Sequence, residues 1–182
     1  MLFRSAVGGE VVFNTGMAGY VETLTDPSYR GQILLLTYPL IGNYGVPSPR
    51  ETGSLSPPYE SDRIQVQGLV VQHYVDDHSH HAATRSLNEW LLSEDIPAVT
   101  GIDTRTVTRR LREHGTMKGW LYPASMELES AQQSAEVIDM RGDVFQLVAP
   151  SEAIHYQGGE LTILVIDVGV KDNIVQIGRA HV

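Results

Sequence analysis

Residues 73–81, HYVDDHSHH, are the densest group of side chains in this sequence that could bind a metal. Imidazole and carboxylate groups are good ligands for first-row metals. Neighbouring residues in a row cannot all converge on one ion, however, and no second group of ligands follows at helical spacing. A solvated loop with helix-capping roles is therefore favoured, and we expect no bound metal. The side chains concerned are His73, Asp76, Asp77, His78, His80 and His81.

Ser28 is the second candidate, because it stands in a polar turn directly before an apolar run, TDPSYRGQILLLTYP at residues 25–39. It lacks the Gly-x-Ser-x-Gly turn of a serine nucleophile, and no histidine and acid partner can be assigned to it. Asp26 and Pro27 suit a structural turn, since Asp bonds the following backbone and Pro fixes φ. The same rigid turn could present a hydroxyl and backbone N–H groups to a small ligand. Turn and ligand contact both remain open at this level.

Four arginines concentrate positive charge on one predicted helix: Arg105, Arg109, Arg110 and Arg112. A DNA-recognition helix is one interpretation, but a formal net charge of -9 opposes binding to a phosphate backbone. Arginine is favoured in ion pairs at protein interfaces. A solvated or partner-facing basic surface is therefore the better interpretation.

The composition narrows the class of protein. The 182 residues are 42% apolar, enough to bury a core, and the acidic balance disfavours nucleic acid and anionic membranes as partners. The chain has no cysteine, which excludes a disulfide framework, a thiolate zinc site and a cysteine nucleophile within these residues. No apolar run approaches the roughly 20 residues of a membrane span, and the start lacks the layout of a secretory signal. We expect a cytoplasmic protein.

These side chains must be positioned by a framework of strands. Short β-branched or aliphatic runs, bounded by Gly, Asp or Pro, are typical of strands. A Gly- and Pro-rich stretch at residues 39–58 predicts an extended surface loop instead. Strands are predicted at residues 9–15, 33–37, 65–73, 96–101 and 118–122.

Three helices accompany the strands. Apolar residues at helical spacing predict an amphipathic helix at residues 82–94. A second helix, which carries the four arginines, begins at a cap formed by Asp103 or Thr104. The third is predicted at residues 126–139, with Glu in its early turns.

The C-terminal part differs in character from the rest. Residues 140–160 are polar and irregular, which suits a linker. Residues 161–167, LTILVID, are almost continuously apolar, as is typical of a strand buried on both faces of a parallel sheet. Gly169 then opens a turn into residues 171–176. This pattern predicts the beginning of a second α/β domain.

Three blocks of sequence resemble one protein family. They are GEVVFNTGMAGYVETLTDPSYRGQILLLTYPLIGNYGVP at residues 9–47, GIDTRTVTRRLREHGTMKG at 101–119 and VIDVGVKDNI at 165–174. They occur in family order and at family-like separations. Together they resemble the small, glutamine-hydrolysing component of carbamoyl-phosphate synthase, a ligase with a glutaminase half-reaction.

The resemblance implies a domain layout. It implies an α/β fold, with a β/β/α-type N-terminal domain, a mixed β-sheet layered with helices, at residues 6–150. A linker at residues 151–160 would follow, and then the truncated start of a class I glutamine amidotransferase α/β domain at 161–176. The family's catalytic Cys, His and Glu would all lie beyond Gln176, so no catalytic residue is expected in this chain.

The resemblance also implies site residues and partners. The serine of the family's Asp-Pro-Ser-Tyr motif contacts the substrate L-glutamine, and that residue is Ser28 here. Asp103, Thr104 and Arg105 match an Ile-Asp-Thr-Arg block, interpreted as helix capping and positioning. The implied partner is the large synthetase subunit or domain, which would carry the ATP and Mg sites, so no cofactor is expected in this chain. Its product would serve pyrimidine and arginine biosynthesis.

Two further expectations concern the extent of the protein. Residues 2–5 and 177–182 can be encoded by DNA strings that resemble a common sequencing-library adapter, so we expect residues 1–5 and 177–182 to be non-native and the chain to be a fragment of a longer reading frame. The alternative to an enzyme subunit is a stand-alone, non-catalytic docking module for a synthetase-like partner. A reading frame that continues into a Gly-x-Cys-x-Gly-type turn would distinguish the enzyme from the module.

Overall fold

The computed structural model describes residues 5–49, 55, 58–135, 137–142, 144–156 and 160–180. Most of the expected non-native N-terminal segment, residues 1–4, and residues 181–182 lie outside the described residues. So do residues 50–54 and 56–57 of the predicted loop.

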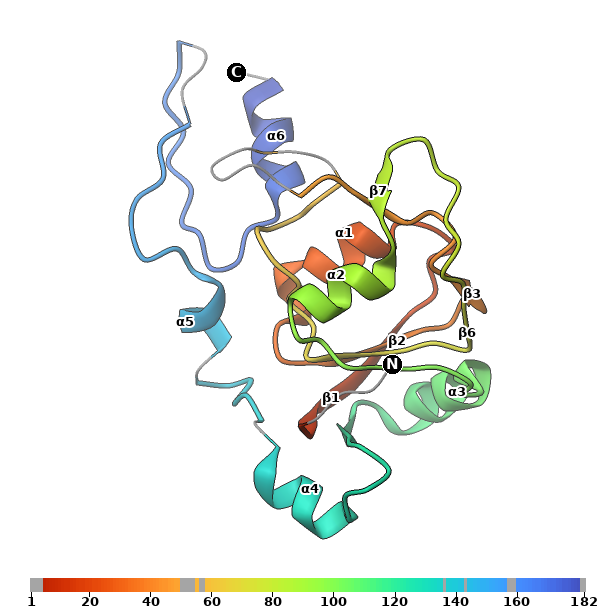
Figure 1. Cartoon of the computed structure of the whole chain (residues 1–182). Coiled ribbons are helices and arrows are strands. Elements are labelled where there is room, and N and C mark those ends of the chain that lie inside the picture. The colour runs from red at the N-terminus through yellow and green to blue at the C-terminus, as the bar shows by residue number, and fades with distance from the viewer. Residues whose placement is uncertain are drawn as a thin grey trace.

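A five-stranded sheet forms the centre of the molecule (Figure 1), in the order β8-β5-β2-β1-β9. The first four strands in that order pair in parallel, and β9 pairs antiparallel with β1. The predicted mixed sheet with helices is thereby confirmed. The strands are β1 (Val7–Asn14), β2 (Ile33–Leu36), β5 (Gly68–Val70), β8 (Ala98–Val99) and β9 (Met117–Leu121).

Strand β2 is buried on both faces, because helices cover the sheet on each side (Figure 1). Leu34 and Leu36 belong to the main core cluster, together with residues of α1 (Tyr20–Thr25) and α2 (Leu87–Ser93). The alternate residues Ile33 and Leu35 face the opposite side, where Val107 of α3 (Thr104–His114) packs against them. The period-2 alternation of a strand thus separates two cores.

Helix α1 lies between the first two predicted strands and was not among the predicted helices. It has six residues, too few for an apolar periodicity to stand out. Burial of Tyr20, Val21 and Leu24 stabilises it, and the Tyr20 hydroxyl donates to the Gly45 carbonyl oxygen at 2.6 Å. Tertiary contacts therefore create this helix.

The prediction that a helix begins at residue 82 is wrong. The Ser86 hydroxyl accepts the Glu89 N–H and the Glu89 carboxylate accepts the Ser86 N–H, so a capping box starts α2 at Leu87. Residues Ala83–Arg85 instead form β7, which pairs with β4 (Val46–Pro47).

The predicted loop at residues 39–58 also contains short strands where it is described. Besides β4, it holds β3 (Leu40–Ile41), which pairs in parallel with β6 (His73–Tyr74). Ile41 and Val46 are buried in the main core. In this Gly- and Pro-rich stretch, the two residues of β3 and the two of β4 are too few to stand out as strands.

The predicted strand at residues 161–167 is wrong. The segment forms no strand and pairs with none among the described residues, and Leu164 and Ile166 are 90% and 84% exposed. A strand buried on both faces needs neighbours on both edges and cover on both faces, and the described part of the chain supplies neither.

Three helices complete the described C-terminal part: α4 (Leu128–Ser134), α5 (Val144–Val148) and α6 (Asp172–Ala180). Helix α4 is shorter than the predicted helix at residues 126–139, and α5 lies within the segment predicted as a linker. None of the described helices has the length and apolarity that a membrane span requires.

Candidate functional site

The turn around Ser28 is built by its two preceding residues. Pro27–Tyr29 form a single turn of 3-10 helix, with Pro27 at its first position. The Asp26 carboxylate caps this turn by accepting the Ser28 N–H at 2.9 Å. Asp26 and Pro27 are buried, whereas Ser28 is exposed. The sequence thus directs one polar side chain outward from a turn held by buried residues.

The backbone N–H groups of this turn already donate hydrogen bonds within the protein. They are therefore not free to bind a ligand, as the sequence had allowed. The Ser28 N–H goes to Asp26, and each of the next four N–H groups donates to a carbonyl oxygen of the protein. The hydroxyl of Ser28 has no hydrogen bond to any described residue. Of the polar groups predicted for a ligand, only the hydroxyl is therefore available. The four N–H groups and the carbonyl oxygens that accept them are Tyr29 to Asp26, Arg30 to Pro27, Gly31 to Gln65 and Gln32 to Tyr29.

Lys171 lies against the turn, a contact that no pattern in the sequence predicts. Its ammonium is 2.8 Å from Asp26 Oδ2, across 145 positions of chain. The hydrogen bond to Asp26 raises the pKa of Lys171, burial opposes this, and the charges of Asp26 and Glu60 add to the increase. Asp26 therefore binds Ser28 through one carboxylate oxygen and Lys171 through the other. Only its place in the block VIDVGVKDNI pointed to Lys171.

Gly169 brings the segment before Lys171 close to the turn. Its φ is +103°, and a Cβ at this position would lie 3.3 Å from Pro27 Cβ and 2.9 Å from Val148 Cγ2. The Asp167 carboxylate accepts the N–H groups of Gly169 and Val170, both at 2.8 Å. The predicted turn at Gly169 therefore exists and contacts the Ser28 turn.

Helix α3 is capped by Asp103, whose carboxylate accepts the Thr106 N–H at 3.0 Å. The Thr106 hydroxyl also donates to the Asp103 carboxylate, at 2.8 Å. The N–H bond first, and the hydroxyl bond second, lower the pKa of Asp103. Thr104 is fully buried instead, and its hydroxyl lies 3.4 Å from the Thr37 carbonyl oxygen. Of the two candidate caps, Asp103 is the one used, and Thr104 attaches the helix to the sheet.

The four arginines of α3 are exposed. Arg105, Arg109 and Arg112 follow the i, i+4, i+7 spacing of one helix face, and Arg110 points about 100° or more away from them. The Arg112 guanidinium also lies over the Phe13 ring, 5.4 Å from its centroid. Because α3 covers the opposite face of the sheet from α1, the structure does not bring these arginines to Ser28.

The histidine-rich loop shows ring contacts. Tyr44 meets His80 edge-on at 6.0 Å between centroids, and the His80 and His81 rings are 4.2 Å apart. Among the described residues, no group of three or more His, Asp or Glu side chains has a geometry that could hold a metal.

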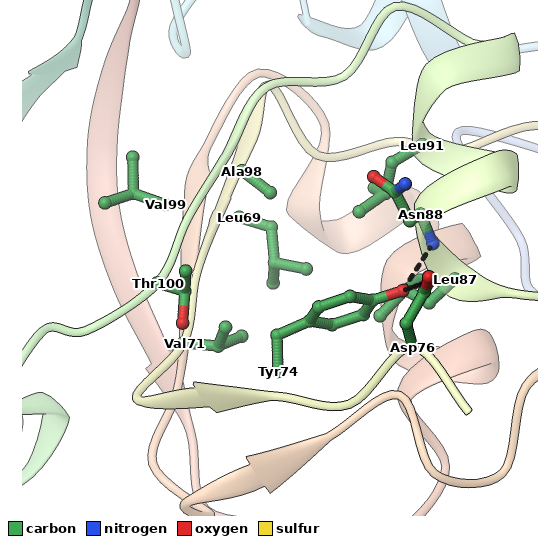
Figure 2. A pocket seen from close by; sticks show the side chains of 10 residues that line it. All are labelled: Leu69, Val71, Tyr74, Asp76, Leu87, Asn88, Leu91, Ala98, Val99 and Thr100. Carbon is green, nitrogen blue, oxygen red and sulfur yellow. Dashed lines mark hydrogen bonds between the residues drawn. The ribbon is translucent and has the colours of Figure 1, made fainter. Parts of the chain in front are cut away.

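A separate pocket of about 210 Å³ lies between α2 and the edge of the sheet (Figure 2). The Tyr74 hydroxyl donates to Asp76 at 2.6 Å and accepts the Asn88 N–H at 3.3 Å. Burial first, and the Asp76 bond second, raise the pKa of Tyr74 to about 12. A phenol held this way stays protonated and does not act as a base. Aliphatic side chains such as Leu69 and Leu91 line the rest, and Ser28 is not part of this pocket.

Comparison with known proteins gives the family. A family model described as carbamoyl-phosphate synthase small chain, CPSase domain, matches residues 2–121. The carbamoyl phosphate synthase small chain of Sulfurisphaera tokodaii is 44% identical over 92% of this chain and 45% of its own length. The multifunctional protein URA2 of Saccharomyces cerevisiae is 42% identical over 93% of this chain and 9% of its own length.

A third relative is the mouse mitochondrial carbamoyl-phosphate synthase [ammonia], 39% identical over 95% of this chain and 11% of its own length. The chain thus spans less than half the length of these relatives. The resemblance seen in the sequence is confirmed by the family model and by relatives of about 40% identity. The chain belongs to the carbamoyl-phosphate synthase small chain family and contains its CPSase domain.

Proposed function

We propose that this chain is part of the glutamine-hydrolysing component of a carbamoyl-phosphate synthase, and that Ser28 contacts the substrate L-glutamine. The observation that carries the proposal is the exposed Ser28 hydroxyl on a turn that Asp26 and Lys171 hold in place. A hydroxyl fixed in this way can bind a carboxamide or carboxylate ligand at low entropic cost. Family membership supports carbamoyl phosphate synthesis as the overall reaction, without choosing its nitrogen source.

The chemistry itself would be performed by residues outside this chain, which has no cysteine. In the proposed reaction a cysteine thiolate adds to the carboxamide carbon of glutamine. The C–N bond breaks, a histidine supplies the proton with which ammonia leaves, and water then hydrolyses the thioester to glutamate. The Ser28 hydroxyl would orient the bound glutamine for this attack. Its contribution is therefore to binding and positioning.

The proposed layout assigns two further roles. Residues 6–150 would form the N-terminal domain that docks on the large synthetase component, where ATP and Mg would bind and where ammonia would react with carboxyphosphate. Residues 161–176 would begin the amidotransferase domain. The exposed apolar side chains of residues 161–168 support this assignment, because they require a covering sheet that the described residues do not provide.

Ammonia is the competing nitrogen source. The mouse relative's name specifies ammonia, so family membership alone does not choose between ammonia and glutamine. An ammonia-dependent synthase would use this domain only for docking and would gain nothing from the Ser28 hydroxyl. The two functions therefore differ in how they respond to a change at this residue.

The test is Ser28→Ala in the full-length protein together with its synthetase component. Loss of one hydrogen bond of about 1 kcal/mol should raise the KM for glutamine about fivefold. Carbamoyl phosphate synthesis from added ammonia should be unchanged, because Ser28 does not contact that reaction. Steady-state rates with each nitrogen source measure both effects. No activity with glutamine in the unmodified protein, or an unchanged KM in the variant, would refute the proposal.

A further inference from the structure

Glu60 lies between the Ser28 turn and helix α6. The Glu60 N–H donates to the Thr25 hydroxyl at 2.9 Å, and the hydroxyl of the next residue, Ser61, donates to the Thr25 carbonyl oxygen at 2.5 Å. Glu60 is 8% exposed. Since Thr25 directly precedes Asp26, these bonds attach the segment around Glu60 to the base of the turn.

The other side of Glu60 receives the start of α6. Its carbonyl oxygen accepts the Asp172 N–H at 3.0 Å, and its carboxylate Oε2 accepts the Asn173 N–H at 3.1 Å. The first N–H groups of a helix have no partner within the helix, and a carboxylate there is stabilising. Glu60 therefore caps α6 from 113 positions away in the chain.

Capping by Glu60 places Lys171, the residue directly before α6, beside Asp26. Asp26 in turn holds the Ser28 N–H. A second polar link, from Gln176 Nε2 to the Leu55 carbonyl oxygen at 2.7 Å, lies one turn further along α6 and does not involve the Ser28 turn. Glu60 is thus the residue that contacts both the base of the turn and the helix that carries Lys171.

We propose that Glu60 is a positioning residue for the glutamine contact: it anchors Thr25 through its backbone, caps α6 through its carboxylate, and so holds Lys171 and Asp26 where they fix Ser28. This inference rests on the proposed function in one respect, namely that Ser28 contacts glutamine. The clamp itself, from Glu60 to α6, does not depend on which ligand binds.

The experiment compares Glu60→Ala and Glu60→Gln in the full-length protein. Hydrogen exchange measured by mass spectrometry on peptides covering residues 169–176 reports the clamp, and the KM and kcat for glutamine report its consequence. For Glu60→Ala we expect exchange in this segment to rise about fivefold, as for loss of a typical helix cap. The KM should rise by a similar factor while kcat at saturating glutamine is retained. Glu60→Gln should give smaller increases, because it keeps an acceptor oxygen but not the charge.

Glu89→Ala is the matched control. It removes the carboxylate that accepts the Ser86 N–H at 2.7 Å in the capping box of α2. Among the described residues, no hydrogen bond or ion pair joins this capping box to the Ser28 turn. Exchange should rise at the start of α2, and the KM for glutamine should stay the same. A general loss of stability would instead affect both capping variants alike.

Unchanged exchange at residues 169–176 in Glu60→Ala overturns the inference. So does a rise in exchange with no change in the KM for glutamine, provided that Ser28→Ala does raise this KM. If Ser28→Ala itself leaves the KM unchanged, the proposed glutamine contact fails, and the role of Glu60 in substrate positioning fails with it. The exchange measurement then still shows whether the clamp exists, so the two failures are distinguishable.

Discussion

At the scale of single residues, the site depends on the hydrogen bond and the ion pair that the buried Asp26 carboxylate makes. Asp26 binds an N–H with one oxygen and an ammonium with the other, so its burial costs little. Ser28 is the exposed polar side chain of the turn, whereas the two residues before it are buried. One hydroxyl, and not a set of backbone N–H groups, is what the turn offers to a ligand.

Gly169→Ala should loosen the docking of α6 beside the turn. Its φ of +103° disfavours any residue with a Cβ, and the added carbon would lie 2.9 Å from Val148 Cγ2. We expect the free energy of opening of residues 169–176, measured by hydrogen exchange, to fall by about 1 to 3 kcal/mol.

Gly178→Ala serves as the control, and both substitutions are made in this 182-residue chain because Gly178 belongs to the segment expected to be non-native. Gly178 lies within α6, and a Cβ there would meet no atom within 4 Å. Replacement of an open helical glycine should stabilise α6 by about 0.5 to 1 kcal/mol. Equal destabilisation by both substitutions would contradict the close approach assigned to Gly169.

At the scale of elements, capping decides where the helices begin. Ser86 with Glu89 starts α2, and Asp103 starts α3. Helix α3 is then attached to the sheet by threonine hydroxyls, since Thr108 and Thr37 share a hydrogen bond of 2.9 Å. Its apolar contribution is limited to Val107 and Leu111, so the cap and the threonine contacts have a large share in holding it.

Asp103 predicts an acid-dependent stability of α3. Its folded pKa is lowered below the ordinary 3.8, so the stabilisation is present above that value and is lost as the pH falls through the folded pKa. Asp103→Asn keeps a neutral cap that does not titrate. Urea midpoints should favour the unmodified chain at about pH 6, and this advantage should vanish by about pH 2. A constant difference between the two chains over this range would contradict the assigned role.

At the scale of the whole molecule, charge and apolar surface are unevenly distributed. The net charge is -9, yet three arginines line one exposed face of α3. Separately, the apolar side chains of residues 161–168 are exposed. The first surface suits an acidic partner, and the second suits a covering sheet. The molecule therefore has two different faces that assembly would bury.

The basic face of α3 leads to a prediction about partner binding. Arg109→Glu in the full-length protein should weaken binding to the proposed large synthetase component about tenfold, or ~1.4 kcal/mol, and reduce its dependence on salt. Arg110→Glu is the matched control, because it makes the same charge change on another side of the same helix. Titrations at two salt concentrations measure both. Equal effects of the two variants would show that net charge, and not this face, governs docking.

The sequence by itself determined the framework of this protein: the strands β1, β2 and β5, the capped helix α3 and the family. Each depends on local patterns, namely apolar runs, turn residues and caps, which can be recognised in the sequence without knowledge of the fold. The two-residue strands β3 and β4, the start of α2 and helix α1 were missed or misplaced, because short elements are stabilised by distant neighbours more than by their own pattern.

Only the tertiary structure decided what holds Ser28 in place. Lys171 meets Asp26, and Glu60 meets the start of α6, across more than a hundred positions of chain. No periodicity or motif encodes such a pairing, because it depends on the path of the whole chain. For the same reason the apolar segment at residues 161–167 did not become a strand: its composition favours burial, but a strand forms only where other strands are present to pair with it.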